Sequence, residues 1–262
     1  EFGLICLESV ENKYLDGNKN IEVKELKDIY PMGEERALIH AIFDKWLEPT
    51  QLPLEGNCVV INAETLSNIT RAVENRKPVI DKDITIIGKL NGGNEPHILF
   101  QVPIGTPIKD LIEDCGGIDG EYGEVIIGGP YTGKAQDLDS SFVTKTSGGA
   151  IVTIPFPKYE GPIGLLVCAC GANEERLRDV AAKMGSEVVG VTKCKNVVDV
   201  KGANKCKTPG DCPGQAEGII KLKRSGAKRV LISNCSDCSN TVMCCAPKMG
   251  LPVYHHTDHV FR

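Results

Sequence analysis

The last hundred residues alternate between short apolar runs and helical segments, and this alternation limits the possible folds more than any other feature of the chain. Apolar runs at residues 165–168, 188–191 and 229–233 have the length and composition of buried strands. Helical segments follow them, such as the one that Asn173 can cap and Gly185 can end. Strands that alternate with helices are typical of parallel sheets. We therefore predict an α/β fold class, with a Cys-rich parallel domain over residues 161–262.

Cysteines gather where these strands end. The chain has 12 cysteines, and nine of them lie between Cys168 and Cys245. Parallel strands end at one edge of a sheet, so thiols that follow different strands should meet along that edge. Clustered cysteines in a chain without a secretion signal are more typical of metal binding or redox chemistry than of a disulfide scaffold. The tail is therefore the first candidate for a functional site.

Three kinds of sulfur site remain open. The usual ferredoxin run of cysteines is absent, so an iron–sulfur cluster such as 4Fe-4S would need unusual spacing. A thiol–disulfide relay is as well supported, and zinc is less favoured. The predicted redox-active sulfurs are Cys168, Cys170, Cys235 and Cys238. The candidate metal ligands are Cys194, Cys206, Cys212, Cys235 and Cys238. Four other thiols are expected to be small buried residues, namely Cys6, Cys58, Cys115 and one of Cys244 and Cys245.

The rest of the chain divides into two segments. Residues 1–92 contain helical patterns at 37–43 and 64–76, a run at 58–61 that predicts a short buried strand, and another strand at 84–87. Residues 93–160 contain apolar runs around one short helix that starts near Pro107, which predicts a small module of strands packed on a helix. The Pro-rich stretch at 155–162 predicts a linker to the third domain, 161–262.

Two further patterns resemble functional motifs, but the residues around each of them disfavour that function. Residues 128–134 nearly spell a phosphate-binding loop, but Ala135 stands where that motif needs a hydroxyl, so we expect a glycine turn. His255, His256 and His259 are metal-ligand types, but they lie close to the end of the chain. We expect them at the surface.

Charge and hydropathy exclude other classes. The formal net charge of −5 disfavours nucleic acid as a partner. No apolar run approaches the roughly 18 residues of a membrane span, and the first residues lack a signal peptide pattern. We expect a cytoplasmic protein with, at most, peripheral association with a membrane complex.

Two motifs resemble a known family. Residues 30–38, YPMGEERAL, are similar to the flavin-subunit motif of NADH:quinone oxidoreductases, and residues 60–66, VINAETL, resemble a second motif of that family with Ile61 in place of an Asn. The middle segment resembles the β-grasp (SLBB) module that follows the flavin domain there. The C subunits of Rnf electron-transfer complexes and the proline-reductase-associated electron-transfer proteins are the nearer resemblances. The cysteine-rich tail favours the latter.

The resemblance implies cofactors and residues. It implies that residues 1–92 are part of an FMN- and NADH-binding α/β domain. The matching positions are Tyr30, Gly33, Glu34 and Glu35, which would face flavin and NADH, and Val60, Asn62 and Thr65, which would contact flavin. The family's glycine-rich flavin loop precedes these motifs, so the chain looks like a C-terminal fragment whose full-length form would bind FMN and NADH. The two ferredoxin-like motifs of the Rnf protein are missing.

The combined hypothesis is an NADH-dependent oxidoreductase or electron-transfer subunit. Electrons would pass from NADH through flavin to the cysteine-rich site, and then to a redox partner such as proline reductase. The alternative is a non-catalytic docking module held together by structural zinc. A third hypothesis is a module that binds a cobalamin-type ligand, because related β-grasp modules occur in such binders.

Overall fold

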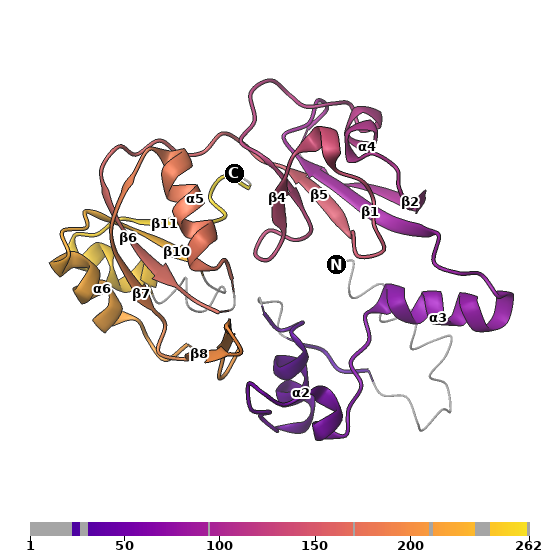
Figure 1. Ribbon diagram of the computed structural model, residues 1–262, viewed down its shortest axis with the longest axis horizontal. Coiled ribbons are helices and arrows are strands. Elements are labelled where there is room, and N and C mark those ends of the chain that lie inside the picture. Colours follow the sequence, from indigo (N-terminus) through magenta and orange to yellow (C-terminus); the bar gives the residue numbers. More distant parts are fainter. Residues whose placement is uncertain are drawn as a thin grey trace.

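Two β-sheets lie side by side in the computed structural model, and helices α2 and α3 lie outside both (Figure 1). The structure describes residues 23–26, 31–93, 95–169, 171–209, 212–233 and 242–260. Predictions for residues such as Tyr30 and Cys170 therefore lie outside the described residues. None of the described helices is both long and apolar enough to cross a bilayer. The fold is mixed α/β, as the sequence predicts.

The first sheet has five strands in the order β2-β1-β5-β3-β4. Strands β1 and β5 are parallel, and the other neighbours are antiparallel. Along β1 alternate side chains are buried, so Ile84 and Ile86 pack with Leu111 of α4 in one core. The elements are β1 (Asp81–Gly88), β2 (His97–Pro103), α4 (Ile108–Asp114), β3 (Val125–Ile127), β4 (Lys134–Gln136), the 3-10 helix η3 (Leu138–Ser140) and β5 (Gly149–Val152).

Strands around one helix are the arrangement that the middle segment predicts, but the central strand is β1. Residues 84–87 are predicted from the sequence to belong to the first segment. In the structure β1 pairs with both β2 and β5. A boundary near residue 92 therefore separates β1 from the strands to which it is bonded.

The second sheet is parallel, with four strands in the order β11-β10-β6-β7. Leu165 and Leu231 pack against α5 on one face, and Leu166 packs against α6 on the other. Burial on both faces explains why the two central strands, β6 and β10, are mostly apolar. Strand order reverses between β6 and β10, the position where open α/β sheets bind ligands. The elements are β6 (Pro162–Val167), α5 (Glu174–Met184), β7 (Glu187–Lys193), α6 (Ala216–Arg224), β10 (Arg229–Ser233), the 3-10 helix η4 (Pro247–Met249) and β11 (Val253–His255).

A hairpin interrupts the second unit between β7 and α6. Strands β8 (Val197–Val200) and β9 (Ala203–Cys206) pair with each other in a sheet of two. Both turn residues, Lys201 and Gly202, have positive φ, as the tight turns of hairpins require. This hairpin carries Cys206 and has no counterpart among the elements predicted from the sequence.

The N-terminal part contains α2 (Glu35–Phe43), the 3-10 helix η2 (Pro53–Gly56) and α3 (Ala63–Asn75). Both α-helices match the predicted helical patterns. The strand expected at 58–61 is wrong, because Val59 is 73% exposed and the segment pairs with no strand among the described residues. An extended apolar run becomes a strand only where a neighbour satisfies its N–H and C=O groups.

Candidate functional site

Cysteines that are far apart in the sequence have backbone positions at the same carboxyl edge of the parallel sheet. Val167 lies in register with Lys193 on one side and with Ser233 on the other. Cys168 and Cys194 are the next residues along β6 and β7, so both stand at this edge. The chain also continues from Ser233 toward Cys235 and Cys238, which lie outside the described residues. The redox role of these thiols stays a prediction.

Cys168 is fixed by the end of β10. Its backbone N–H donates to the Ser233 hydroxyl at 3.2 Å, and that hydroxyl donates to the carbonyl oxygen of Ala172. Ser233 has no exposed surface, and Cys168 is 3% exposed. The loop that leaves β6 is therefore tied at both ends to one buried hydroxyl of the neighbouring strand. Such ties hold a site residue in a single position.

Cys194 has a polar environment that ordinary core cysteines lack. The side-chain amide of Gln215 donates to Cys194 Sγ at 2.9 Å, and Gln215 is itself only 3% exposed. Nearby, the backbone N–H of Gly214 lies 3.4 Å from Cys212 Sγ, to which it donates. Hydrogen bonds to sulfur are one of the means by which proteins tune sulfur-ligated redox centres. The loop before α6 thus serves two of the predicted ligands.

The metal-ligand set is only partly tested by this geometry. Among the described residues, no three His, Cys, Asp or Glu side chains gather as metal ligands would. Cys194, Cys206 and Cys212 therefore do not form a three-ligand group by themselves. A cluster or a zinc ion that uses them would draw further ligands from Cys235 and Cys238, so this role remains a prediction.

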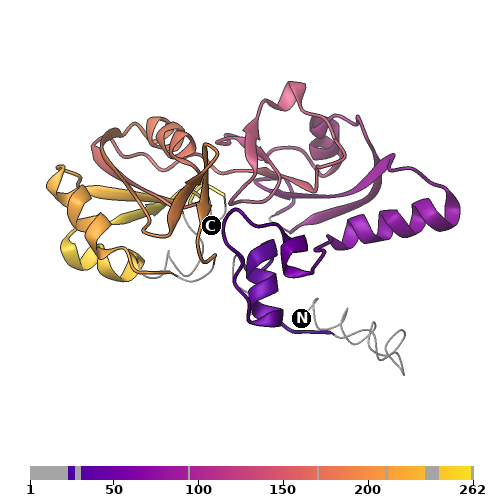
Figure 2. The ribbon, with the colours of Figure 1, turned by 60° about the horizontal axis from the view of Figure 1, so that its bottom comes forward.

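Arg36 joins the flavin-type motif to the cysteine-bearing hairpin. Its guanidinium donates to the carbonyl oxygens of Cys206 at 2.6 Å and Lys207 at 2.5 Å, and twice to that of Leu47 at 3.0 and 2.8 Å. The side chain is 7% exposed. A buried guanidinium is tolerated where carbonyl oxygens satisfy its donors. Figure 2 shows α2 beneath the two sheets. Sequence reasoning missed Arg36, whose only signal is a charge on the buried face of α2.

The flavin-type residues lie at the starts of two helices. Glu34 caps α2, because its carboxylate accepts from the N–H groups of Arg36 and Ala37 at 2.9 Å each. Asn62 caps α3 by accepting from the N–H of Glu64 at 2.9 Å. The other described residues of this set, Gly33, Glu35 and Thr65, are exposed and Val60 is half-buried. Capping accounts for the acidic and amide side chains in the motif, and contact with flavin remains a prediction.

An apolar cavity of about 410 Å³ lies between α2 and the segment at 57–61. Val60 lines it together with Leu38, Ile42 and Phe43, and no basic side chain is among its lining residues. An isoalloxazine ring could rest on such a wall, but nothing in the lining would hold the FMN phosphate. The described residues therefore fit FMN only in part.

A buried ion network joins the two sheets. Glu124, just before β3, binds Arg176 through both carboxylate oxygens, Lys183 Nζ at 2.9 Å and His259 Nε2 at 2.8 Å. Burial alone would raise the pKa of Glu124, but these three partners outweigh burial and hold that pKa well below its usual range. Asp179 pairs with the same two cations at 2.7 and 2.8 Å. The network fixes α5 against the first sheet.

The surface position expected for the terminal histidines is wrong for two of the three. His256 is 3% exposed and His259 is 1% exposed. The chain end folds back because β11 pairs with β10, and because the N–H of Ile154 donates to the carbonyl oxygen of His259 at 2.9 Å. The His259 ring also stacks on Phe156. A position near the last residue is therefore no guide to exposure here.

Comparison with known proteins agrees with the motifs. Residues 6–71 match the family described as the Nuo51 FMN-binding domain. The chain is 31% identical over 157 residues to the C subunit of the Na(+)-translocating ferredoxin:NAD(+) oxidoreductase complex of Acetobacterium woodii, a match that covers 60% of this chain and 35% of that protein. It is 36% identical over 137 residues to the proton-translocating counterpart of Clostridium ljungdahlii, covering 52% and 29%. It is 34% identical over 132 residues to the cobalamin reductase PduS of Citrobacter freundii, covering 50% and 28%.

These similarities support a relationship to the family of Rnf C subunits. The chain spans about a third of the length of these relatives.

Proposed function

We propose that the chain is part of an electron-transfer protein. Flavin, reduced by NADH at the N-terminal motifs of the full-length form, would deliver electrons to the cysteine edge of the parallel sheet. The residues assigned to this site are Cys168 and Cys194 at that edge, together with Cys170, Cys235 and Cys238, which lie outside the described residues. An iron–sulfur cluster and an exchanging thiol pair are both compatible with this route.

The observation that best supports the proposal is the set of hydrogen bonds from Arg36 to the carbonyl oxygens of Cys206 and Lys207. Arg36 belongs to the flavin-type motif, and it binds the carbonyl oxygen of Cys206 across 170 residues of sequence. A donor site and an acceptor site in one protein must lie close together for electrons to pass between them. The buried guanidinium supports such proximity, because it holds the flavin-type helix α2 against the hairpin that carries a predicted sulfur ligand.

We further propose that the partner that accepts the electrons is a reductase, and that proline reductase is the favoured candidate. That choice rests on the combination of flavin-type motifs and a cysteine-rich tail, and not on a contact in the structure. The SLBB character of the five-stranded module and the domain limit near residue 160 are proposals of the same standing. Peripheral attachment to a membrane complex is a further proposal, drawn from the names of the relatives.

Composition and kinetics test this function in the full-length protein. Anaerobic preparation should yield either iron with acid-labile sulfide or a disulfide that exchanges with thiols. Arg36→Lys keeps the charge but cannot span three carbonyl groups, so transfer from reduced flavin to the sulfur site should slow. Arg178→Lys is the matched control, because Arg178 makes only an exposed ion pair with Glu174. A preparation that contains no iron and no exchangeable disulfide would overturn the proposal for the tail.

A docking module with structural zinc is the second candidate. One specific observation favours it, the uncovered apolar face of α3. Leu66, Ile69 and Val73 recur at helical spacing and are 44–76% exposed, and α3 buries no residue. Zinc near one atom per chain, with thiols that neither exchange nor change redox state, would select this function. Retention of the protein on a corrin column would instead favour a cobalamin-type acceptor.

A further inference from the structure

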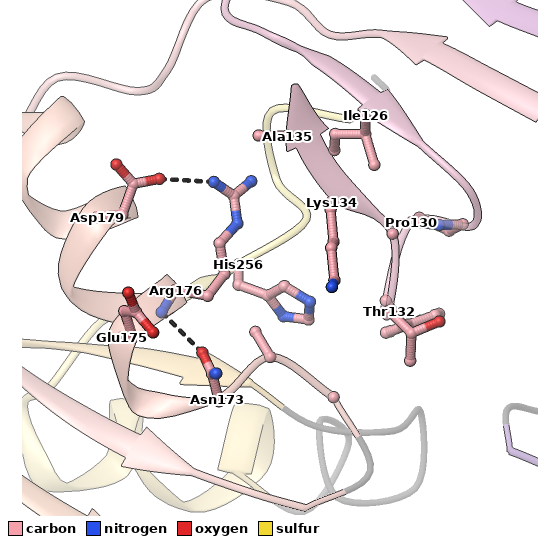
Figure 3. A pocket seen from close by; sticks show the side chains of 14 residues that line it. Ile126, Pro130, Thr132, Lys134, Ala135, Asn173, Glu175, Arg176, Asp179 and His256 are labelled. Carbon is pink, nitrogen blue, oxygen red and sulfur yellow. Dashed lines mark hydrogen bonds and ion pairs between the residues drawn. The ribbon is translucent and has the colours of Figure 1, made fainter. Parts of the chain in front are cut away.

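A cavity of about 520 Å³ lies between the two sheets, apart from the flavin-type motifs (Figure 3). Thr132 and Lys134 line it from the five-stranded sheet. Asn173 and Arg176 line it from the start of α5, and His256 lines it from the residue after β11. The cavity thus opens at the carboxyl edge of the parallel sheet, and its volume is within the usual range for small-molecule sites.

The side chain of His256 is the feature of this cavity that best indicates a ligand. Its side chain is buried, yet neither ring nitrogen has a hydrogen-bond partner among the described residues. Burial, followed by the charge of His255, lowers the pKa of His256 to about 3, so the ring is neutral. Backbone groups of Tyr131 and Ile232 act on that pKa in the opposite direction, but neither makes a complete hydrogen bond to the ring. Buried polar groups without partners are costly and call for an explanation.

A cation and a helix start face the same space. Figure 3 shows the Lys134 side chain extending toward the His256 ring, with Thr132 nearby. The Lys134 ammonium makes no ion pair with the described residues. Asn173 caps α5 through the N–H of Arg176 at 2.9 Å, and the earlier N–H groups of a helix have no partner within it. Lys134 and the N-terminus of α5 therefore both favour an anion.

This arrangement suggests a role for the glycine turn at residues 128–134. A phosphate-binding loop needs a helix directly after it, and here strand β4 follows instead. Gly133 packs so closely on the carbonyl oxygen of Gly129 that a side chain would clash. The turn thus brings Lys134 to the cavity, and α5 of the other sheet supplies the helix start. The two halves of an anion site come from two separate segments.

The charges around the cavity limit the negative charge that a bound ligand can carry. Glu175 and Asp179 also line it, and Arg176 is already paired with Glu124 and Asp179. Lys134 is thus the lining cation that forms no ion pair among the described residues, and Glu175 adds a carboxylate to the same lining. This balance suits a single phosphate and disfavours a triphosphate. The Tyr131 ring lies 5.9 Å from that of His256, which gives the cavity an aromatic wall beside the anion position.

We propose that this cavity binds a small phosphate monoester of nucleotide size. The phosphate would lie between Lys134 and the N-terminus of α5, and the neutral His256 ring would hydrogen-bond to the ligand. The proposal stands apart from the electron-transfer function, since it uses none of the cysteines and none of the flavin-type residues.

Calorimetry on the whole chain tests this with four probes: AMP, ribose 5-phosphate, adenosine and inorganic phosphate. A phosphate monoester should bind, and adenosine should not. Lys134→Gln should weaken binding by about tenfold or more, since a charge-assisted hydrogen bond is lost. Lys145→Gln is the matched control, because Lys145 is exposed and lies outside the cavity. Binding of inorganic phosphate as tightly as of both monoesters would overturn the ligand class, and absence of any binding would overturn the site.

His256→Phe separates a ligand-binding histidine from a structural one. Phenylalanine puts a slightly larger aromatic ring in place of the imidazole and removes two nitrogens that have no partner among the described residues, so the melting temperature should stay about the same or rise. Monoester binding should nevertheless fall by about tenfold or more, as expected for a lost hydrogen bond in a buried site. A variant that melts earlier, or one that binds the monoester as well as the parent chain, contradicts the assignment.

Discussion

Replacing Glu124 by glutamine should destabilise the protein strongly, because one carboxylate serves three partners. The change leaves volume almost unaltered but removes the charge, and the new amide presents donors toward Arg176 and Lys183, which are donors themselves. Removing one partner of a buried ion pair costs about 3–5 kcal/mol. Asp179 still binds both cations at 2.7 and 2.8 Å, so the lower end, about 3 kcal/mol, applies here.

Thermal unfolding followed by circular dichroism measures this loss. For a chain of this size, about 3 kcal/mol corresponds to a fall in melting temperature of about 6–12 °C. Asp139→Asn is the control, because that carboxylate is 75% exposed and binds only Lys109 at 2.7 Å. It should change stability by less than about 1 kcal/mol. Glu124→Gln with a melting temperature like that of the control would refute the role given to the network.

The same carboxylate makes stability depend on pH. Its pKa in the folded protein is well below the ordinary value of 4.5, so its contribution is complete above that value. As the pH falls below 4.5 toward the folded pKa, the unfolded state takes up the proton first and stability is lost. The parent chain should therefore lose more stability than Glu124→Gln between neutral pH and the acid range. Parallel acid titrations of the two proteins that run at a constant difference would contradict this.

Three further substitutions, one of them a control, test local geometry. Gly88→Ala would place a methyl group 2.0 Å from the carbonyl oxygen of Val152 at a φ of +119°, so it should cost about 3 kcal/mol or more in urea unfolding. Gly92→Ala, at φ +103° in open space, should cost only about 1–2 kcal/mol, and equal losses would argue against the clash. Ser233→Ala should cost about 1–3 kcal/mol and expose Cys168 to faster alkylation, because the buried N–H of Cys168 loses its acceptor. An unchanged alkylation rate would show that Ser233 does not hold that loop.

The parallel sheet could be predicted from the sequence because its signal is local. Strand and helix periods alternate over residues 161–262, and the rule that parallel strands end at one edge then places Cys168 and Cys194. The helix start at Asn173 followed in the same way from a single residue that can cap. These features need no knowledge of what lies across the fold.

The rest depends on contacts between distant residues, which no local pattern announces. Arg36 meets Cys206 across 170 residues, and Glu124 meets His259 across 135. The strand expected at 58–61 fails for the same reason, since strand formation depends on a partner elsewhere. The burial of His256 depends on where β11 pairs, and not on its distance from the chain end.

An anaerobic titration of the full-length protein with NADH, followed in the visible range, tests the central claim most directly. The account predicts that the flavin bands bleach and that further reducing equivalents then enter the cysteine-rich tail. They would be seen as loss of iron–sulfur absorbance or as newly titratable thiols. Flavin that is fully reduced while the tail takes up no electrons would contradict the account.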